Sequence, residues 1–293
     1  MTCLFNRLII AGVGLIGGSL GLAVRERGLV GEVVGFGRTE ANLKLGLERG
    51  CIDAYTFDPA EAAREADLFL LAVPVAATRR VLEQFIPHLP PGCIVTDAGS
   101  VKEQVVTVLE ELLPASLPCV GAHPVAGTEQ AGAGAAFASL FENRLCVLTP
   151  TPRTDPAALA RVRELWQAVG MRVEEMDMRV HDRVLARVSH LPHVIAFSVM
   201  NAVLANPLAD VDALAYAGSA FHDLSRVAAS PVEMWRDICL ENRQALLDAV
   251  TEFEAALADF KAAIAGADGK ILAEMMAAAR TERQRLTRLR ERS

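Results

Sequence analysis

A glycine-rich turn near the start of the chain restricts the possible folds more than any other feature. The spacing G-x-G-x-x-G occupies residues 12–17, directly after the apolar run Leu8–Ala11 and before a helix-like segment that ends near Arg27. In that setting the first glycine permits a tight turn, the second lets the backbone approach a pyrophosphate, and the third lets the helix pack closely on the strand. Free N–H groups at the start of the helix then hold the phosphates. The pattern predicts a dinucleotide site with contacts at Gly12, Gly14, Leu15, Ile16 and Gly17.

The rest of the first 177 residues alternates between short apolar runs and helix-like segments. The runs are apolar nearly throughout, which is typical of strands buried on both faces of a parallel sheet. This alternation predicts a Rossmann-type, doubly wound α/β domain with a mostly parallel sheet. The expected strands are Leu8–Ala11, Val33–Phe36, Leu68–Val73, Ile94–Asp97, Cys119–Gly121, Leu145–Leu148 and Arg172–Glu174. The expected helices between them include Glu40–Arg49, Thr78–Phe85, Val101–Leu113 and one that starts at Asp155-Pro156.

The character of the sequence changes after about residue 177. Strand-like runs end there, and alanine and leucine recur at spacings of three and four. We therefore expect a dinucleotide-binding domain over residues 1–177 and an all-helical domain over 178–293. The segment Ser230-Pro231-Val232-Glu233 has the form of a capping box, so a helix should begin at Pro231 and continue toward Ala265. Glycines at 266 and 269 then interrupt the helices.

The choice of dinucleotide depends on the end of the second expected strand. NAD enzymes usually place an acidic residue there to bind the ribose 2′-hydroxyl, but this chain has Gly37, Arg38 and Thr39. A guanidinium at Arg38 pairs well with the 2′-phosphate of NADP. The segment favours NADP, with Arg38 and Thr39 as contacts, and leaves open an NAD enzyme in which Arg38 stacks on adenine. Val73 and Pro74, at the end of the third expected strand, are further expected cofactor contacts.

Charge and composition exclude several other classes of protein. The chain has 29 basic and 36 acidic residues and a net charge of −7, which argues against nucleic-acid binding. Only 5% of residues are aromatic, which disfavours a base-stacking surface, whereas 52% are apolar, enough for a large core.

The cysteines and the apolar stretches indicate in which cellular compartment the protein is expected. The six cysteines form no C-x-x-C pair, so we expect free thiols in a reducing compartment and no zinc site. Residues 8–24 carry no charge, like a signal-peptide core, but the order of their glycines is better explained by the dinucleotide turn. No later stretch is expected to span a membrane. The sequence therefore predicts a cytoplasmic protein without membrane or nucleic-acid partners.

A candidate catalytic histidine lies in the segment Gly121–Glu129. His123 follows an expected strand, and ligands of doubly wound folds bind at the carboxyl ends of strands. Ser100 leaves the preceding strand at the same edge, so it could reach His123. Spacing alone leaves a catalytic and a structural role for His123 equally open. His190 and His193 have i,i+3 spacing, but no acidic residue stands at ligand spacing beside them, so no metal is expected.

Five phrases occur in one order along the chain: GVGLIGGSL, DAGSVK, GAHPVAGTE, SHLPH and DLSRVAASPVEMW. Together they make residues 8 to about 243 resemble the prephenate/arogenate (cyclohexadienyl) dehydrogenase family. The resemblance implies a nucleotide-binding domain followed by a helical domain that forms a homodimer. It also implies oxidative decarboxylation of prephenate or arogenate with hydride transfer to NAD(P), which gives 4-hydroxyphenylpyruvate or tyrosine in tyrosine biosynthesis.

The same resemblance implies roles for individual residues. His123 accepts the proton of the substrate hydroxyl, and Ser100 orients His123 and also touches the cofactor. Arg226 binds the ring carboxylate, and His193 and His181 lie near the substrate side chain and the pocket entrance. Trp235 either forms a wall of the pocket or belongs to the core. Thr128, with Glu129, shapes the loop beside His123.

Two features depart from the family pattern, and two other functions remain open. The second strand lacks its acidic residue, and Gly218–His222 replaces a more glycine-rich stretch that ends in Lys or Arg. The first alternative is a β-hydroxyacid or imine reductase with the same two-domain plan. The β-hydroxyacid enzymes commonly rely on a lysine in the helical domain, and here the only lysines after Lys102 are Lys261 and Lys270, which come late in helix-like surface sequence. The second is an NADP-binding redox sensor without turnover.

Overall fold

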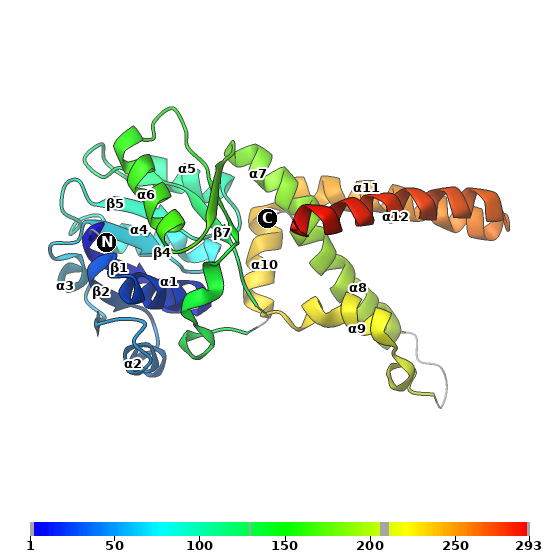
Figure 1. Ribbon diagram of the computed structural model, residues 1–293, viewed down its shortest axis with the longest axis horizontal. Helices are drawn as coiled ribbons and strands as arrows, with labels where there is room; N and C mark the ends of the chain where they lie inside the picture. The colour runs from blue at the N-terminus through cyan, green and yellow to red at the C-terminus, as the bar shows by residue number, and fades with distance from the viewer. Residues whose placement is uncertain (1–2, 129, 206–210, 292–293) are drawn as a thin grey trace. The chain divides into compact units, whose positions relative to one another are not determined.

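The computed structural model describes residues 3–128, 130–205 and 211–291 (Figure 1). Its main sheet has six parallel strands in the order β3-β2-β1-β4-β5-β6. The strands are β1 (Phe5–Ala11), β2 (Val30–Phe36), β3 (Ala54–Thr56), β4 (Leu68–Leu71), β5 (Ile94–Asp97) and β6 (Cys119–Val120). This order is that of a Rossmann-type doubly wound sheet, so the predicted fold class is confirmed.

Helices cover both faces of this sheet. They are α1 (Leu15–Glu26), α2 (Glu40–Glu48), α3 (Pro59–Ala63), α4 (Thr78–Phe85), α5 (Glu103–Leu112) and α6 (Pro156–Ala168). Because side chains alternate along a strand, Leu8 and Ile10 of β1 pack on one face with Trp166 of α6, while Ile9 packs on the other with Phe85 of α4. Strands buried on both faces account for the near-continuous apolar runs in the sequence.

A second, smaller sheet follows the first. It contains β7 (Ala122–Val125), β8 (Leu145–Leu148) and β9 (Arg172–Glu175) in that order, with β7 antiparallel to β8 and β8 parallel to β9. The sequence interpretation missed β7 and β3, because neither forms a continuous apolar run, and it extended the strand at 119 to Gly121. His123 therefore lies inside a strand, β7, and not in a loop after one.

The remainder of the described chain is helical. It comprises α7 (Met178–Leu185), a π-helical segment (Ala186–His190), α8 (Leu191–Ala205), α9 (Ser219–Ser225), α10 (Val232–Glu241), α11 (Arg243–Ala265) and α12 (Gly269–Glu291). The predicted capping box at Ser230 is wrong: α10 starts at Val232 after Pro231 with no side-chain cap. The predicted long helix also breaks at Asn242, which leaves helical geometry and turns its amide toward His190 and the carbonyl of Asp182.

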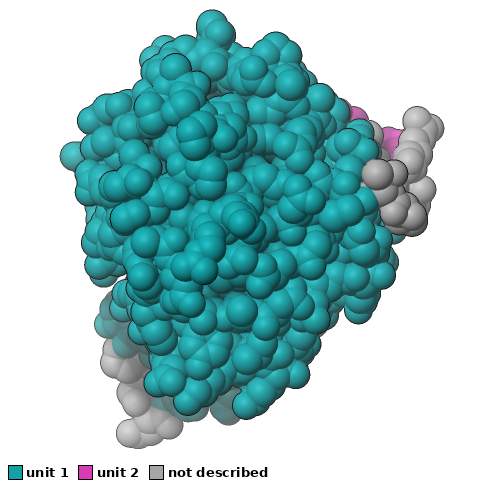
Figure 2. Space-filling model, turned by 90° about the vertical axis from the view of Figure 1, so that its left-hand side faces the viewer, with its two compact units in different colours: residues 1–243 teal, residues 244–293 magenta. Residues whose placement is uncertain are grey.

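The chain divides into two compact units, 1–243 and 244–293, and Figure 2 shows one face of the first. This division lies beyond the expected boundary at 177/178, because Trp235 and Ile238 of α10 share an apolar core with Phe85 of α4 and Leu109 of α5. The second unit contains most of α11 and all of α12, joined by a turn in which Ala267 has a positive φ of 47°.

One stretch contradicts an expectation from the sequence. Met178–Ala205 forms a helix of 28 residues that is long and apolar enough, by length and composition, to cross a membrane. The sequence interpretation missed it because charged residues near Met178 hide the apolar run that follows. The helix leaves Val188 and Leu204 exposed to 68% and 64% in a single chain.

Candidate active site

The glycine turn has the geometry of a dinucleotide cradle. Gly12 has φ +98°, and a Cβ there would lie 2.3 Å from the carbonyl oxygen of Ala72. A Cβ on Gly17 would lie 2.3 Å from the carbonyl oxygen of Gly12. By contrast, a Cβ on Gly14 would meet nothing within 4 Å, and Gly14 is the N-cap of α1. Open space beside the free N–H groups of Leu15 and Ile16 fits a pyrophosphate.

The cradle lies where the strand order of the sheet reverses. β1 and β4 are parallel neighbours, and their carboxyl ends lead into the glycine turn and into Val73 and Pro74. Val73 is half-buried and lies against the glycine turn, whereas Pro74 is exposed. This edge is where doubly wound sheets bind dinucleotides.

Arg38 and Thr39 follow β2 at the same edge. Both side chains are exposed, and Thr39 is the N-cap of α2 without using its hydroxyl to cap the helix. Within the described ranges, Arg38 makes no hydrogen bond or ion pair. The two side chains are therefore available to an anionic group near the end of β2.

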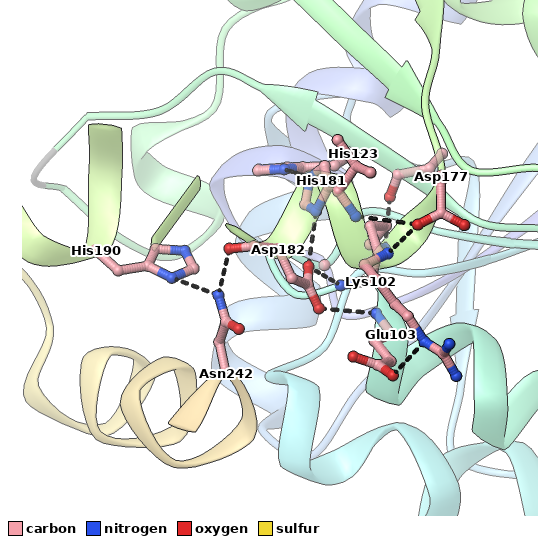
Figure 3. Close-up of polar contacts among 12 residues, drawn as sticks. Lys102, Glu103, His123, Asp177, His181, Asp182, His190 and Asn242 are labelled. Carbon is pink, nitrogen blue, oxygen red and sulfur yellow. Dashed lines mark hydrogen bonds and ion pairs between the residues drawn. The ribbon is translucent and has the colours of Figure 1, made fainter. Parts of the chain in front are cut away.

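His123 lies at one end of a chain of buried polar contacts (Figure 3). Its side chain comes from β7 and is 8% exposed, and its Nδ1 lies 2.8 Å from Nε2 of His181. Nδ1 of His181 lies 2.7 Å from Oδ1 of Asp182. The backbone N–H of Lys102 donates to Oδ1 of Asp182 at 2.8 Å, and that of Glu103 donates to Oδ2 at 2.9 Å. The contacts connect β7 to the first turn of α5 through α7.

A buried ion pair lies behind His123. The Nζ of Lys102 pairs with the carboxylate of Asp97 at the end of β5 and donates to the carbonyl oxygen of Ala122 at 2.8 Å. The carboxylate of Asp97 also accepts the backbone N–H groups of Gly99 at 2.8 Å and Ala122 at 3.0 Å. Because Ala122 precedes His123, these bonds hold β7 against the carboxyl end of β5.

The environment keeps the histidines of this region neutral. Burial, followed by the nearby His181, Lys102 and His190, holds the pKa of His123 well below its usual value. Burial also lowers the pKa of His181, although its hydrogen bond to Asp182 acts in the opposite direction. A neutral imidazole is the form that can accept a proton.

Ser100 lies where the sequence suggested, in the half-buried loop between β5 and α5. The structure shows no hydrogen bond between Ser100 and His123 within the described residues; the ring partner of His123 is His181. His181 is fully buried with both ring nitrogens in contact with protein groups, so it is not at a pocket entrance in this chain. Sequence spacing could not distinguish these two partners.

His193, Trp235 and Arg226 are close to one another. The ring of His193 stacks on Trp235 with centroids 3.5 Å apart, and its Nδ1 donates to the carbonyl oxygen of Ser189 at 2.9 Å. Burial lowers the pKa of His193, and nearby Arg226 lowers it further. Trp235 is 6% exposed and belongs to the apolar core, whereas Arg226 is exposed.

The remaining predicted positions are peripheral. Thr128 is exposed, and its Oγ1 accepts the backbone N–H of Gln130 at 3.2 Å. Glu129 lies outside the described residues. No group of three or more His, Cys, Asp or Glu side chains that could hold a metal ion occurs in the part of the chain that the structure describes.

Sequence reasoning missed four polar residues that support this region: Lys102, Asp182, His190 and Asn242. Lys102 and His190 carried a weak signal, since they stand inside the phrases DAGSVK and SHLPH, and Asp182 directly follows His181. Asn242 carried none, because its contacts with Asp182 and His190 join residues 60 and 52 positions apart.

Known proteins that resemble this chain have the same order of domains, a nucleotide-binding domain followed by a dimerization domain. Residues 20–175 match the nucleotide-binding domain of prephenate dehydrogenase, and residues 177–278 match its dimerization domain. The chain is 38% identical over 271 residues to the cyclohexadienyl dehydrogenase of Zymomonas mobilis, covering 92% of each chain. It is 32% identical over 249 residues to the prephenate dehydrogenase of Bacillus subtilis, covering 85% of this chain and 67% of the relative.

Solved structures give the same result. Prephenate dehydrogenase of Aquifex aeolicus, in complex with hydroxyphenyl propionate and NAD+, aligns with a TM-score of 0.91 and 34% identity over 96% of this chain and 98% of the other. Arogenate dehydrogenase of Synechocystis aligns with a TM-score of 0.80 and 30% identity over 96% and 99%. With both domains matched in order, the chain belongs to the prephenate dehydrogenase family of oxidoreductases.

Proposed function

We propose that this protein catalyses the oxidative decarboxylation of prephenate, arogenate or both, with hydride transfer to a nicotinamide cofactor. The observation that carries the proposal is a buried, neutral His123 beside the end of β5, at the carboxyl edge that also holds the glycine turn. Family membership supplies the substrate class.

The proposed reaction needs a hydride acceptor, a base for the hydroxyl proton and a cation that binds a substrate carboxylate. A nicotinamide cofactor, when bound, would supply the hydride acceptor for the ring carbon that bears the hydroxyl. His123 accepts the hydroxyl proton as the hydride leaves. The ring carboxylate then leaves as carbon dioxide, its bonding electrons make the ring aromatic, and the proton returns from His123 to the ring oxygen to give the phenol. Arg226 would bind a substrate carboxylate, and its closeness to His193 supports this assignment. We assign Arg226 mainly to positioning, because tight ground-state binding of the departing carboxylate would oppose its loss.

We propose NADP as the preferred cofactor and NAD as an accepted alternative. Support comes from the exposed Arg38 and the uncommitted hydroxyl of Thr39 after β2, where Gly37 stands in place of the acidic residue usual in NAD enzymes. The Aquifex aeolicus relative was solved with NAD+. Replacing Arg38 with Ala should raise the KM for NADP by about tenfold or more and change the KM for NAD little.

The first experiment measures initial rates of reduced-nicotinamide formation with prephenate and arogenate, each paired with NAD and NADP. We expect turnover in at least one pair, and the substitution His123→Asn should lower kcat by about 100-fold or more while cofactor affinity survives. No turnover with any of the four pairs, together with intact cofactor binding, would favour a reductase or a redox sensor instead. Unchanged turnover after His123→Asn would overturn the assignment of the base.

We further propose a cytoplasmic homodimer that forms through the helical part. The match of residues 177–278 to a dimerization domain supports the homodimer, and so do the exposed apolar side chains of Val188 and Leu204. The free thiols of the described cysteines are consistent with a reducing compartment.

A further inference from the structure

Asp182 is held in a state in which it can only accept hydrogen bonds from its neighbours. It is 3% exposed, and its two oxygens face the backbone N–H groups of Lys102 and Glu103. A backbone N–H is always a donor, and the positive end of α5 further favours a carboxylate here. Oδ1 therefore accepts from Nδ1 of His181 as well, at 2.7 Å.

This acceptor determines the tautomer of His181. A neutral imidazole carries one N–H, and that N–H must lie on Nδ1, because Nδ1 faces Asp182. Nε2 of His181 is left with a lone pair that faces Nδ1 of His123 at 2.8 Å. Two lone pairs would repel one another there, so Nδ1 of His123 carries the hydrogen.

We infer that Asp182 and His181 are positioning residues that hold His123 in the tautomer with its lone pair on Nε2. In this tautomer His123 can accept a proton only at the ring nitrogen that no described protein group contacts. The opposite tautomer would direct an N–H at the substrate hydroxyl, where a base is needed. The inference deepens the proposed function, on which its kinetic test rests.

We call the contacts from Asp182 through His181 to His123 the relay. The relay also determines how the positive charge is stabilised after His123 has accepted the proton. The hydroxyl proton bonds to Nε2 of His123 while the ring carbon that bears the hydroxyl loses its hydride, and the proton returns to the ring oxygen once the carboxylate has left and the ring is aromatic. The resulting imidazolium keeps its Nδ1 hydrogen, which donates to His181, while the Asp182 carboxylate lies one imidazole further away. No proton needs to move along the relay, because His181 orients and polarises while the charge stays on His123.

Other charged and titratable groups surround the relay. Asp97 faces it from β5, Lys102 from the loop before α5, and His190 from the π-helical segment. The amide of Asn242 donates to the carbonyl oxygen of Asp182 at 2.9 Å and faces Nδ1 of His190 at 3.1 Å. His190 is therefore bonded separately and does not compete for the ring of His123.

A direct test reads the tautomer without any turnover. Two-bond 15N–1H correlation spectra of the full-length protein, labelled at histidine nitrogens, distinguish protonated from unprotonated ring nitrogens. We expect His123 with a protonated Nδ1 and an unprotonated Nε2, and His181 with the same pattern. The His88→Gln and His222→Gln spectra help assign the six histidines. A protonated Nε2 on neutral His123 would overturn the inference even if the enzyme is active.

A matched pair of substitutions supplies the kinetic test. His181→Asn keeps a side-chain donor near Asp182 but removes the acceptor for His123, whereas His181→Gln can place an amide oxygen near the former Nε2. We expect His181→Asn to lower kcat by about 100-fold and His181→Gln by less than about tenfold, with KM changed little in both. Asp177→Asn, an exposed cap at the start of the same helix, is the control and should keep parental rates.

The results of these tests distinguish a failure of the positioning role from a failure of the proposed function. Parental kcat in His181→Asn, with unchanged unfolding temperature and cofactor affinity, would overturn the positioning role. Equal losses in both His181 variants with an unchanged His123 tautomer would do the same. An absence of turnover in the parent enzyme would contradict the proposed function and would leave the tautomer measurement to decide this inference.

Discussion

Asp97 and Lys102 form a buried ion pair in which the stability of each charge depends on the other. Their side chains are 2% and 0% exposed, and their ion pair holds the end of β5 beside β7. Taking two charges out of water is costly, and that cost is recovered only while both partners remain. The two backbone N–H groups that Asp97 also accepts reduce the cost without cancelling the charge.

We therefore predict that Lys102→Met lowers the free energy of unfolding by about 3 kcal/mol, because Asp97 is left as an uncompensated buried anion. Urea unfolding followed by circular dichroism measures this loss. Lys44→Met is the control, since Lys44 pairs with Glu40 on the surface at 57% exposure and should change the free energy of unfolding far less than Lys102→Met does. Similar small losses in both variants would mean that the backbone donors alone stabilise Asp97.

His190 should make the stability of the protein depend on pH. Burial lowers its pKa to about 4, and its Nε2 has no hydrogen-bond partner within the described residues. The unfolded chain, with a histidine pKa of about 6.5, binds more protons between those values. The stabilisation is thus fully present above about pH 6.5 and is lost as the pH falls toward about 4, on the order of 3 kcal/mol in total.

The test compares urea midpoints at pH 7 and pH 4.5 in the parent and in His190→Gln. The variant should lose less stability on acidification, because it lacks the group that must remain neutral in the fold. His88→Gln, which changes an exposed histidine, should keep the parental pH dependence. An unchanged slope in His190→Gln would show that other groups account for the acid sensitivity.

At the scale of elements, the start of α1 separates a structural glycine from a functional one. Gly12 needs its positive φ and its closeness to Ala72, whereas Gly14 has φ −99° and open space where the methyl group of an alanine would lie. Gly14→Ala should therefore keep the fold but raise the cofactor Kd by about tenfold or more, because the methyl group occupies the place of the pyrophosphate.

Gly12→Ala is the contrasting variant. Its Cβ would clash with the carbonyl oxygen of Ala72 at 2.3 Å, so we expect a large fall in unfolding temperature and little recoverable folded protein. Calorimetric titration of NADP and thermal unfolding measure the two effects. Parental cofactor affinity in Gly14→Ala would place the phosphates away from this turn.

Elements with a clear apolar pattern were predictable, and elements without one were not. The strands at 94–97 and 145–148 and the helix at 78–85 have the expected bounds, because each carries a clear apolar pattern. β7 was missed, although it holds His123: its four residues include Pro124 and show no alternation. α10 and α11 were merged, because the break at Asn242 comes from contacts with Asp182 and His190 rather than from a helix-breaking residue type.

At the scale of the whole molecule, the helical part leaves apolar surface exposed in a single chain. Val188 and Leu204 are 68% and 64% exposed, and Ile264 and Met276 of the second unit are 66% and 57% exposed. Contiguous exposed apolar surface usually marks an interface. In the proposed homodimer, a second copy of the chain would cover the stretch Met178–Ala205, and this would account for its apolar composition without a membrane.

We predict that light scattering without detergent gives twice the mass of one chain. Leu204→Glu should shift the protein toward monomers, because a carboxylate would be buried in the interface. Leu47→Glu, on α2 of the nucleotide-binding domain, should remain a dimer. A monomeric parent, or a protein that is dispersed only by detergent, would contradict this assignment.

The sequence alone was enough to predict the dinucleotide fold, the helical second part and His123 as a candidate. These features rest on local patterns: glycine spacing between a strand and a helix, apolar runs buried on both faces, and short phrases around single residues. The boundary at 177/178 and the roles of Ser100, Arg226 and His193 stay predictions.

Only the tertiary structure decided what surrounds His123. Its contact with His181 joins residues 58 positions apart, and that of Asp182 with the start of α5 joins residues 80 apart. Such contacts depend on how α7 packs against β7 and α5, to within the few tenths of an ångström that a hydrogen bond allows. Periodicity gives the face of an element but not this distance, so the partner that orients His123 could be assigned only from the folded chain.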